Sequence, residues 1–395
     1  MTDRPLRLGV AGLGRGFILM VPALSMHPHL KVVACADPRP EARARFAADF
    51  KARGYESVEA MCEDPEVEAV YIATPHQFHA ANAIAAAKAG KHMLVEKPLA
   101  LTLEECQAMI AAAKQAGVHL LVGPSHGYDA PVVETQKLIA SGAYGRLGLI
   151  TAVQYTDFMY RPRRPEELVT AEGGGVVFSQ GAHQVEIVRM LAGGLATSVR
   201  AATTVLDAGR RSEGAYTAFL SFANGAAATL TYSGYNHFDS DELCGWISEA
   251  GTRKDPERYG ASRRALQTVT GGAAEAALKM DRGYGGRNYV PPPPVEGRVH
   301  EHFGFIVASC EKADLRPLPD GILVYGDDAR ELRPLPKPVI PRRGPIDELY
   351  DVVVRGRPPV HTGEWGLATL EVCLAILRSA AEGREIGLQH QVPAP

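Results

Sequence analysis

The chain has 395 residues, of which 46% are hydrophobic and 22% are charged, and its formal net charge at pH 7 is -3. This balance is typical of a globular protein with a sizeable core, and the length favours two domains over one. The weakly acidic charge argues against a nucleic-acid-binding protein, which would carry a basic domain.

The sequence carries no pattern typical of a membrane or secreted protein. No apolar run approaches the roughly 18 residues of a membrane span, and the first residues lack the charged-then-apolar pattern of a secretory signal. The six cysteines are scattered without a Cys-x-x-Cys pair, which favours buried reduced thiols over disulfides or a structural zinc site. We therefore expect a cytoplasmic protein with no membrane contact.

The first third of the chain alternates between strand and helix patterns. This alternation predicts a doubly wound parallel sheet with helices on both faces, which we place at residues 1–125. The predicted strands are Leu6–Ala11, Val32–Ala36, Ala69–Ala73, His92–Val95 and Leu120–Gly123, and the predicted helices are Glu41–Arg53, Phe78–Ala89 and Leu103–Ala116.

A glycine-rich loop follows the first strand and reads GLGRGF from residue 12. Gly12 suits a tight strand-to-helix turn, and Gly14 lets the backbone approach a pyrophosphate at the N-terminus of the next helix. Arg15, Gly16 and Phe17 complete the loop that we expect to bind the cofactor. Phe17 stands where the third glycine of a GxGxxG motif would fall, and we expect it to loosen the packing of helix on strand.

An acidic residue ends the second predicted strand. Asp37 lies 25 residues after Gly12, where a carboxylate accepts hydrogen bonds from the adenosine ribose hydroxyls of a dinucleotide. A carboxylate there repels a 2′-phosphate, so NAD is favoured over NADP, although Arg39 keeps NADP possible. The alternative is a glycine turn in a fold that no longer binds a nucleotide.

A lysine stands directly after the fourth predicted strand, in Glu96-Lys97-Pro98. Pro98 restricts Lys97 to an extended backbone, at the carboxyl end of a strand where open α/β sheets bind their ligands. We interpret Lys97 as a proton-handling residue. An ion pair with Glu96, or a contact with a phosphate, is the alternative, and we expect both Glu96 and Lys97 to lie against the cofactor.

After about Gly123 strand patterns dominate. They predict a second domain at residues 126–395, with a large, mostly antiparallel open sheet and helices on one face. The other face would be solvated or covered by a second subunit. The supporting signals are a hairpin at Tyr216–Phe222 and Ala226–Tyr232 around Asn224-Gly225, and helices at Pro131–Ser141 and Glu364–Glu382.

One long segment of this half resists the pattern. Residues 252–298 are rich in glycine, arginine and proline, and we expect a lid or a partly ordered insertion there.

Three further runs follow in order along the chain: ATPHQFH from residue 73, GGG from 173 and GAH from 181. Together with the glycine turn, Asp37 and Glu96-Lys97-Pro98, they closely resemble the Gfo/Idh/MocA oxidoreductases. This resemblance implies a Rossmann dinucleotide-binding domain, a substrate domain on a large open sheet, hydride transfer to or from nicotinamide, and assembly into a homodimer or homotetramer through that sheet.

The resemblance also implies roles for single residues. It puts Thr74, Pro75 and His79 beside the ribose and nicotinamide, and His183 on a helix that faces the cofactor. With Lys97 handling the hydroxyl proton, His183 would assist, because its ordinary pKa suits proton exchange near neutral pH.

The substrate side shows one departure from the family. The family usually carries an aspartate four residues before the histidine, where this chain has Ser179. The proton relay must then use Lys97 and His183 alone, use another acid, or be absent. Glu186 could orient His183 or be a solvated helix residue. We expect the substrate pocket to be lined by His183, His126, Tyr128 and Gln180.

Arginines after residue 160 suggest the kind of substrate. The run YRPRRPEE and the segment HEHFG from residue 300 are similar to the branch with phthalate cis-dihydrodiol dehydrogenases. Arg161 and Arg163, with Arg164 beside them, could clamp a carboxylate bidentately, or they could form an exposed basic loop.

These patterns together predict an NAD-dependent dehydrogenase acting on the CH–OH of a cyclic polyol, sugar or carboxylated cis-dihydrodiol. His76 and His79 are expected to bind no metal, because no third ligand with suitable spacing accompanies them. The alternatives are an NADP-dependent reductase of a ketone or imine, and a non-catalytic dinucleotide-sensing regulator, which the serine at 179 would favour.

Overall fold

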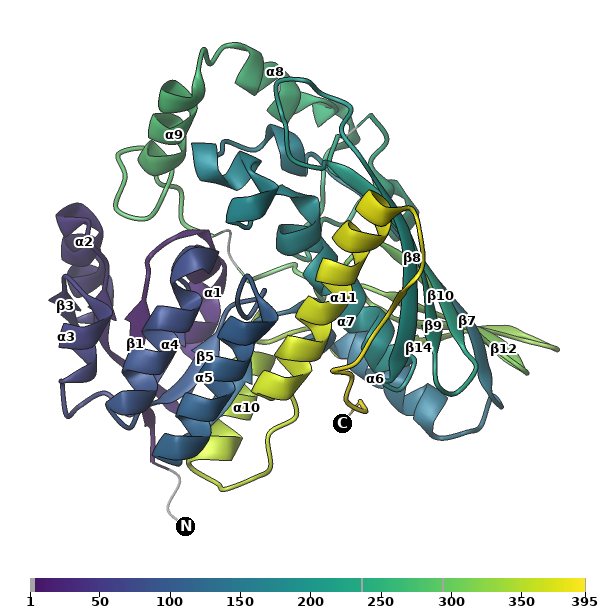
Figure 1. The fold of residues 1–395 in the computed structure, drawn as a ribbon, viewed down its shortest axis with the longest axis horizontal. Helices are drawn as coiled ribbons and strands as arrows, with labels where there is room; N and C mark the ends of the chain where they lie inside the picture. The colour runs from purple at the N-terminus through teal and green to yellow at the C-terminus, as the bar shows by residue number, and fades with distance from the viewer. Residues whose placement is uncertain (1–3, 236, 293–294, 395) are drawn as a thin grey trace. The chain divides into compact units, whose positions relative to one another are not determined.

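The structure is a computed structural model that describes residues 4–235, 237–292 and 295–394 (Figure 1). The chain forms two compact units. Unit 1 comprises Met1–Pro124, Ala276–Val295 and Ile340–Leu367, and unit 2 comprises the three remaining segments, Ser125–Glu275, Glu296–Val339 and Ala368–Pro395. Within the described ranges, no helix is both long enough and apolar enough to cross a membrane.

A six-stranded parallel sheet forms the centre of unit 1, with the strand order β3-β2-β1-β4-β5-β6. This is the order of a doubly wound Rossmann sheet, as predicted. It reverses between β1 and β4, so a ligand crevice is expected at their carboxyl ends. The strands are β1 (Leu6–Ala11), β2 (Leu30–Ala36), β3 (Arg53–Tyr55), β4 (Ala69–Ile72), β5 (His92–Val95) and β6 (Leu120–Val122).

Helices cover both faces of this sheet. On one face, α1, α2 and α10 enclose a core with Leu8 and Val10 of β1, because alternate strand residues point to the same side. On the other face, α3, α4 and α5 pack side by side (Figure 1). The helices are α1 (Arg15–Met26), α2 (Pro40–Phe50), α3 (Val58–Cys62), α4 (His79–Lys88), α5 (Leu103–Ala116) and α10 (Gly344–Val353).

The second predicted helix ends earlier than expected. Lys51 adopts a left-handed conformation with φ of 54° and stops α2 at Phe50, and Arg53–Tyr55 then forms the edge strand β3. The prediction of a helix to Arg53 was wrong because lysine is an uncommon residue in this conformation and gives no sequence signal for a helix end.

The predicted domain boundaries also differ from the structure, because two segments of the second half pack with the Rossmann sheet. Tyr284 is 1% exposed in the core beside α1, and Ile346 and Tyr350 of α10 are buried in the same core. These apolar side chains, which lie far along the sequence, thus complete the packing on the face of the Rossmann sheet that α1 and α2 cover only in part. The segment 252–298, predicted as one lid or insertion, is divided between the two units, because residues up to Glu275 belong to unit 2 and Ala276–Val295 belong to unit 1.

A nine-stranded sheet forms unit 2, in the order β14-β13-β12-β11-β7-β10-β9-β8-β15. Only β7 and β10 are parallel; the other described pairs are antiparallel, as predicted. The strands are β7 (Leu147–Tyr155), β8 (Ala196–Thr204), β9 (Ala215–Phe222), β10 (Ala227–Ser233), β11 (Phe305–Cys310), β12 (Ala313–Leu318), β13 (Gly321–Gly326), β14 (Arg330–Pro334) and β15 (Ile386–Gly387).

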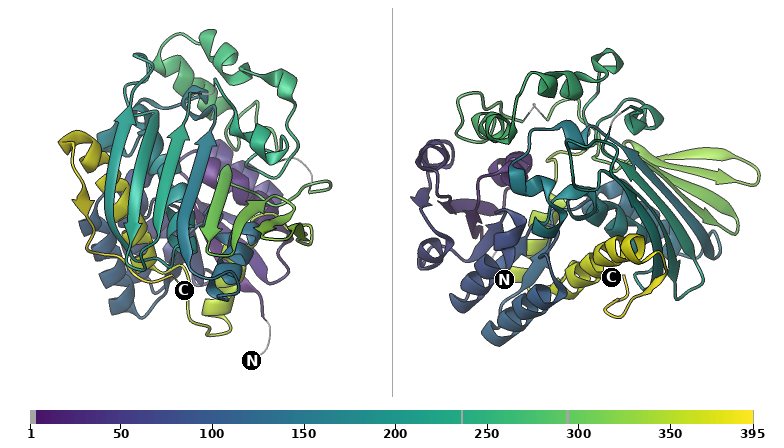
Figure 2. Two further views of the ribbon diagram at one scale, coloured as in Figure 1. Left: turned by 90° about the vertical axis from the view of Figure 1, so that its right-hand side faces the viewer. Right: turned by 45° about the horizontal axis from the view of Figure 1, so that its top comes forward.

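The predicted hairpin is confirmed as β9 and β10, with Gly225 at φ of 82° in the turn. One face of the sheet is covered by helices, and Figure 2 (left) shows the strands from the uncovered side with the helices behind. The helices of unit 2 are α6 (Ala130–Ala140), α7 (Ala182–Leu191), α8 (Ala261–Gln267), the first residues of α9 (Gly272–Asp281) and most of α11 (Gly363–Glu382).

Candidate active site

The glycine turn allows other backbone segments and a ligand to come close to its own backbone. Gly12 has φ of 87°, and a Cβ there would lie 2.8 Å from the backbone of Thr74, so only glycine fits between the loops after β1 and β4. A Cβ on Gly14 would meet nothing closer than the carbonyl oxygen of Ala73 at 3.9 Å. The N-terminus of α1, which begins at Arg15, therefore stays open to a phosphate, and the loop fits a dinucleotide.

Phe17 does not loosen this helix. Its side chain is fully buried, and its ring lies 5.6 Å from that of Phe46 and 4.8 Å from that of Tyr284, centroid to centroid. Gly16 provides the close approach one position earlier, because a Cβ there would lie 2.8 Å from Glu96 Oε1. Phe17 thus acts through packing, and its side chain is not placed to touch a ligand.

Asp37 is 5% exposed, and its carboxylate is hydrogen-bonded to neighbouring residues. Its carboxylate accepts hydrogen bonds from the Leu13 N–H at 2.9 Å and from Arg39 Nε and Nη2 at 2.9 and 3.0 Å. Arg39 also donates to the carbonyl oxygens of Leu13 and Tyr284. Four of the five guanidinium N–H groups are thereby used, which leaves little capacity for a 2′-phosphate.

The ATPHQFH run forms a support for the loop after β4. His79 is fully buried, with Nε2 2.9 Å from the Thr74 carbonyl oxygen and Nδ1 3.0 Å from the Pro98 carbonyl oxygen. Burial lowers the pKa of His79. The ring therefore ties the loop after β4 to the loop after β5. Asn82, which sequence reasoning missed, donates to Thr74 Oγ1 at 3.0 Å; Pro75 lies between these anchored residues.

Glu96 and Lys97 stand at the carboxyl end of β5, as predicted. Tyr71 donates to Glu96 Oε1 at 2.6 Å. Burial raises the pKa of Glu96, and the positive charges of Lys97 and Arg342 oppose that rise. Glu96 is thus a half-buried carboxyl group that interacts electrostatically with Lys97.

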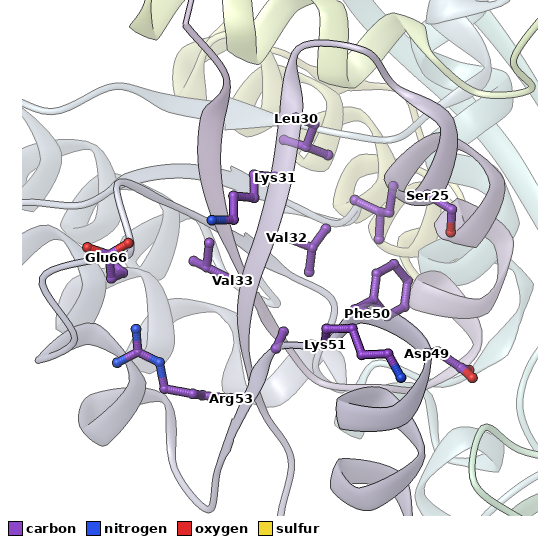
Figure 3. Close-up of a pocket in the computed structure, with 12 residues that line it drawn as sticks. Ser25, Leu30, Lys31, Val32, Val33, Asp49, Phe50, Lys51, Arg53 and Glu66 are labelled. Carbon is purple, nitrogen blue, oxygen red and sulfur yellow. The ribbon is translucent and has the colours of Figure 1, made fainter.

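A hollow of about 460 Å³ lies elsewhere in unit 1 (Figure 3). It is lined by Leu30 and Val32 of β2 and by Phe50 and Arg53, among others. Since β2 begins at Leu30, this hollow is at the amino-terminal end of the strands, opposite to the glycine turn. We therefore do not assign the dinucleotide to it.

In unit 2 the triple glycine shapes the entry to α7. Gly173 and Gly175 have φ of 83°, and a Cβ on Gly175 would lie 2.1 Å from Glu213 Oε1. Glu213 accepts hydrogen bonds from the Val177 N–H at 3.2 Å and from the Thr170 hydroxyl. The loop is folded around this carboxylate and leads into a π-helix at Val177–Gly181, a distortion that is frequent at functional sites.

His183 follows in the first turn of α7 and is 6% exposed. Its Nδ1 lies 3.2 Å from the Ser125 hydroxyl oxygen, and its ring centroid lies 4.8 Å from that of His126 and 5.2 Å from that of Phe303. The structure thus brings the two predicted histidines together. It adds Ser125 and Phe303, and the latter lies in the HEHFG segment singled out in the sequence.

His126 has acidic neighbours that sequence reasoning missed. Its Nδ1 lies 2.6 Å from Asp129 Oδ2, and its Nε2 lies 3.7 Å from Glu249 Oε1. Asp129, three residues later, could have been suspected from its spacing. Glu249 could not, because only the fold brings it to this site.

The other residues predicted in this pocket are placed as follows. Gln180 is buried in the π-helix, and Tyr128 is half-buried in the short helix at His126–Tyr128. Glu186 is 4% exposed, so it is not a solvated helix residue. A Cβ on Gly127 would lie 2.8 Å from Glu186 Oε1, which shows that Glu186 packs under the loop that carries His126.

The arginines after residue 160 do not form one exposed basic loop. Arg161 Nε lies 2.8 Å from Asp157 Oδ1, and its Nη2 lies 3.8 Å from Glu249. Burial alone would lower the pKa of Arg161, but these two carboxylates outweigh it and raise the pKa. Arg164 is paired with Glu166 at 2.8 Å.

Arg163 differs from both neighbours. Its guanidinium stacks on the Phe158 ring at 3.6 Å and donates to the Phe158 carbonyl oxygen at 2.7 Å. Burial lowers its pKa to about 10. Among the described residues Arg163 makes no ion pair within 4.0 Å, and the charge of Glu167 only partly opposes the effect of burial on its pKa.

Within the described ranges there is also no group of three side chains that could hold a metal ion. The two histidines of the ATPHQFH run pack edge to face, with ring centroids 5.6 Å apart.

Comparisons with known proteins agree with this geometry. Residues 6–124 match the Gfo/Idh/MocA description of an oxidoreductase family with an NAD-binding Rossmann fold, and residues 132–250 match the Gfo/Idh/MocA C-terminal domain. The chain is 46% identical over 373 residues to a 1-carboxy-3-chloro-3,4-dihydroxycyclohexa-1,5-diene dehydrogenase of Comamonas testosteroni, covering 94% of each chain.

More distant and structural relatives lead to the same family. A scyllo-inositol 2-dehydrogenase (NAD+) of Bacillus subtilis is 30% identical over 207 residues, which cover 52% of this chain and 59% of that protein. The crystal structure of a proposed dehydrogenase from Bordetella bronchiseptica RB50 aligns with a TM-score of 0.90 and 40% identity, over 97% of this chain and 100% of that one. The chain is thus an NAD-binding dehydrogenase that belongs to the Gfo/Idh/MocA oxidoreductase family.

Proposed function

We propose that this dehydrogenase oxidises a CH–OH group of a cyclic dihydrodiol that carries a carboxylate. The observation that carries the proposal is Arg163, a half-buried guanidinium that makes no ion pair with a carboxylate among the described residues. A partly desolvated cation of this kind is stabilised by an anionic ligand. The relative at 46% identity acts, by its name, on a carboxylated dihydroxycyclohexadiene, which supports the same class here.

The residues of unit 1 would hold the dinucleotide. The open backbone at Gly14 and the N-terminus of α1 would bind the pyrophosphate, and Asp37 would accept the ribose hydroxyls. NAD, when bound, supplies a nicotinamide ring that takes the hydride from the carbinol carbon. The commitment of Arg39 to Asp37 favours NAD over NADP.

The proton would be handled by Lys97, with His183 assisting. Lys97 stands at the strand end where α/β sheets bind ligands, beside the half-buried carboxyl group of Glu96. It must be neutral to accept the hydroxyl proton, and partial burial beside a cationic nicotinamide favours the neutral amine. His183 has a partner in Ser125 that fixes the orientation of its ring.

The carboxylate assignment is tested with Arg163→Gln and a pair of substrates. A hydrogen bond to a charged group contributes about 1.5–3 kcal/mol, so KM for a dihydroxycyclohexadiene carboxylate should rise about 10- to 150-fold. KM for the same diol without the carboxyl group should stay unchanged. Arg164→Gln is the matched control, since it removes the same charge from the same segment. Equal effects on both substrates would refute the carboxylate contact.

We also propose that two copies associate through the uncovered face of the unit 2 sheet. Leu149 and Phe219 lie on that face and are 43% and 45% exposed. Apolar side chains on an open sheet face favour a partner surface, and a second copy presents the same strands. Phe219→Asp should lower the mass measured by light scattering; a monomeric wild-type protein would contradict the proposal.

A reducing compartment such as the cytoplasm fits the thiols. All six cysteines are free, and five of them are buried. Burial raises the pKa of Cys106 and of Cys35 to about 12, so these thiols are poor nucleophiles. Unchanged thermal unfolding on addition of a reductant to the purified protein would support this assignment.

A further inference from the structure

Ionisable side chains from three separate segments of unit 2 surround His126. Asp129 belongs to the same loop, with Oδ2 2.6 Å from His126 Nδ1. Glu249 comes from a loop far along the chain, with Oε1 3.7 Å from His126 Nε2. His183 of α7 presents its ring at 4.8 Å between centroids and at an interplanar angle of 76°. Phe303 packs against both imidazole rings.

The two carboxylates favour a second proton on His126. A carboxylate only accepts hydrogen bonds, so the contact with Asp129 assigns a proton to Nδ1. A neutral ring would then turn the lone pair of Nε2 toward the carboxylate of Glu249. A protonated ring turns one N–H toward each carboxylate, which is the favourable arrangement.

The charges continue beyond Glu249. Arg161 Nη2 lies 3.8 Å from Glu249 Oε2, and Arg161 Nε lies 2.8 Å from Asp157. The row from Asp129 to Asp157 thus contains three carboxylates and one guanidinium, and Glu186 adds another carboxyl group under the loop of His126. A proton taken up by His126 brings this row closer to neutrality.

This arrangement lies beside the position where the family's usual aspartate is missing. Ser179 precedes His183 by one turn and cannot hold a proton as a carboxylate does. We propose that His126, held between Asp129 and Glu249, accepts the proton from His183 and thereby takes over that task. The proposal rests on the dehydrogenase function proposed above.

The step moves one proton and no electrons. The hydroxyl proton is accepted by Lys97 and passes to His183, so that an N–H bond of Lys97 breaks and one forms at His183. An N–H bond of His183 then breaks, and an N–H bond forms at His126 Nε2. The two rings are in edge-to-face contact, with centroids 4.8 Å apart and ring planes at 76°, and in the proposed step a water molecule bound to a nitrogen of each ring carries the proton. His126 later gives the proton to solvent. It acts through His183, so it is a relay and positioning residue, and Asp129 and Glu249 hold its charge.

The first test needs no substrate. The ring C–H signals of His126 and His183 are followed by NMR during a pH titration of the full-length protein, and they are assigned with His126→Gln and His183→Gln. Glu249→Gln should lower the titration midpoint of His126 by about one pH unit, because an opposite charge is removed. Glu242→Gln, at an exposed glutamate seven residues before Glu249 in the sequence, is the matched control and should leave it unchanged. An unchanged midpoint in Glu249→Gln would overturn the proposal.

The second test measures turnover of a dihydroxycyclohexadiene carboxylate with NAD. His126→Gln and Glu249→Gln should each lower kcat about 100-fold near neutral pH, with KM within threefold of the wild-type value. The loss should shrink as the pH is raised, because hydroxide then removes the proton from His183. A loss of equal size at every pH, or a loss confined to KM, indicates a packing role and overturns the relay.

The two tests separate this inference from the function on which it rests. A wild-type protein that turns over no such diol contradicts the proposed function, while the titration still decides whether Glu249 holds a proton on His126. Turnover with an unshifted titration midpoint retains the function and removes the relay.

Discussion

The interplay of Asp37 and Arg39 makes a sharp prediction for cofactor preference. Replacing Asp37 with serine removes a carboxylate that would bind the ribose and that now accepts two hydrogen bonds from the Arg39 guanidinium. Arg39 Nε and Nη2 then become available to a 2′-phosphate, which also loses a repelling charge.

The magnitude follows from counting these contacts. A hydrogen bond to a charged group contributes about 1.5–3 kcal/mol. Loss of one such contact to NAD and gain of one to NADP therefore shift the preference by at least about 3 kcal/mol, roughly 100-fold in the ratio of the two Kd values.

The assay is titration of NADH and NADPH into wild-type protein and Asp37→Ser, followed by fluorescence or calorimetry. Glu56→Gln is the control, since it removes an exposed carboxylate that pairs with Arg43 in the same unit. Thermal unfolding checks that losing the bond from the Leu13 N–H leaves the unit folded. A Kd ratio that stays at the wild-type value would refute the assignment of Asp37 to the ribose.

Three further predictions concern unit 1. Phe17→Ala should lower the free energy of unfolding by about 3–5 kcal/mol in denaturant titrations, because the Phe17 ring is fully buried. This loss is expected even though a small residue at position 17 restores the usual glycine motif. Gly12→Ala should abolish NADH binding, since its Cβ would meet backbone atoms at 2.8 Å; unchanged binding would contradict the geometry. Burial alone would raise the pKa of Asp347, but hydrogen bonds and charges from His27 and Arg343 outweigh it and lower the pKa to about 2. The stability that the ionised carboxylate contributes is therefore present above its ordinary pKa of 3.8 and is lost as the pH falls toward 2. Asp347→Asn should therefore unfold more easily than wild type at pH 6, and the difference, about 1 kcal/mol or less for a partly exposed pair, should vanish near pH 2.

Local signals in the sequence were sufficient for much of unit 1. The helix Leu103–Ala116 was predicted with its bounds from its apolar spacing and from the glycine at 117. In the structure Thr102 and Glu105 form a capping box at its start, and Gly117 ends it in a left-handed conformation. The strand Leu6–Ala11 was equally clear from its apolar run before the glycine turn. In contrast, α2 ends at Lys51 because this lysine adopts a left-handed backbone conformation, which its residue type does not predict.

Long-range packing limited the rest. Tyr284 joins the Rossmann core from a segment that looked like a lid, because burial of its ring against Phe17 is a property of the fold. The site shows the same limit. Lys97, His183 and His126 could be named from the sequence, yet Glu249 comes beside His126 only when the loops of unit 2 assemble.

The most direct test of the central claim is the rate of NADH formation from a dihydroxycyclohexadiene carboxylate by wild-type protein and by Lys97→Gln. We predict turnover by the wild type and a loss of kcat of about 100-fold or more in Lys97→Gln, with Kd for NADH within threefold of the wild-type value. Absence of turnover in the wild type, or full activity in Lys97→Gln, would contradict the account.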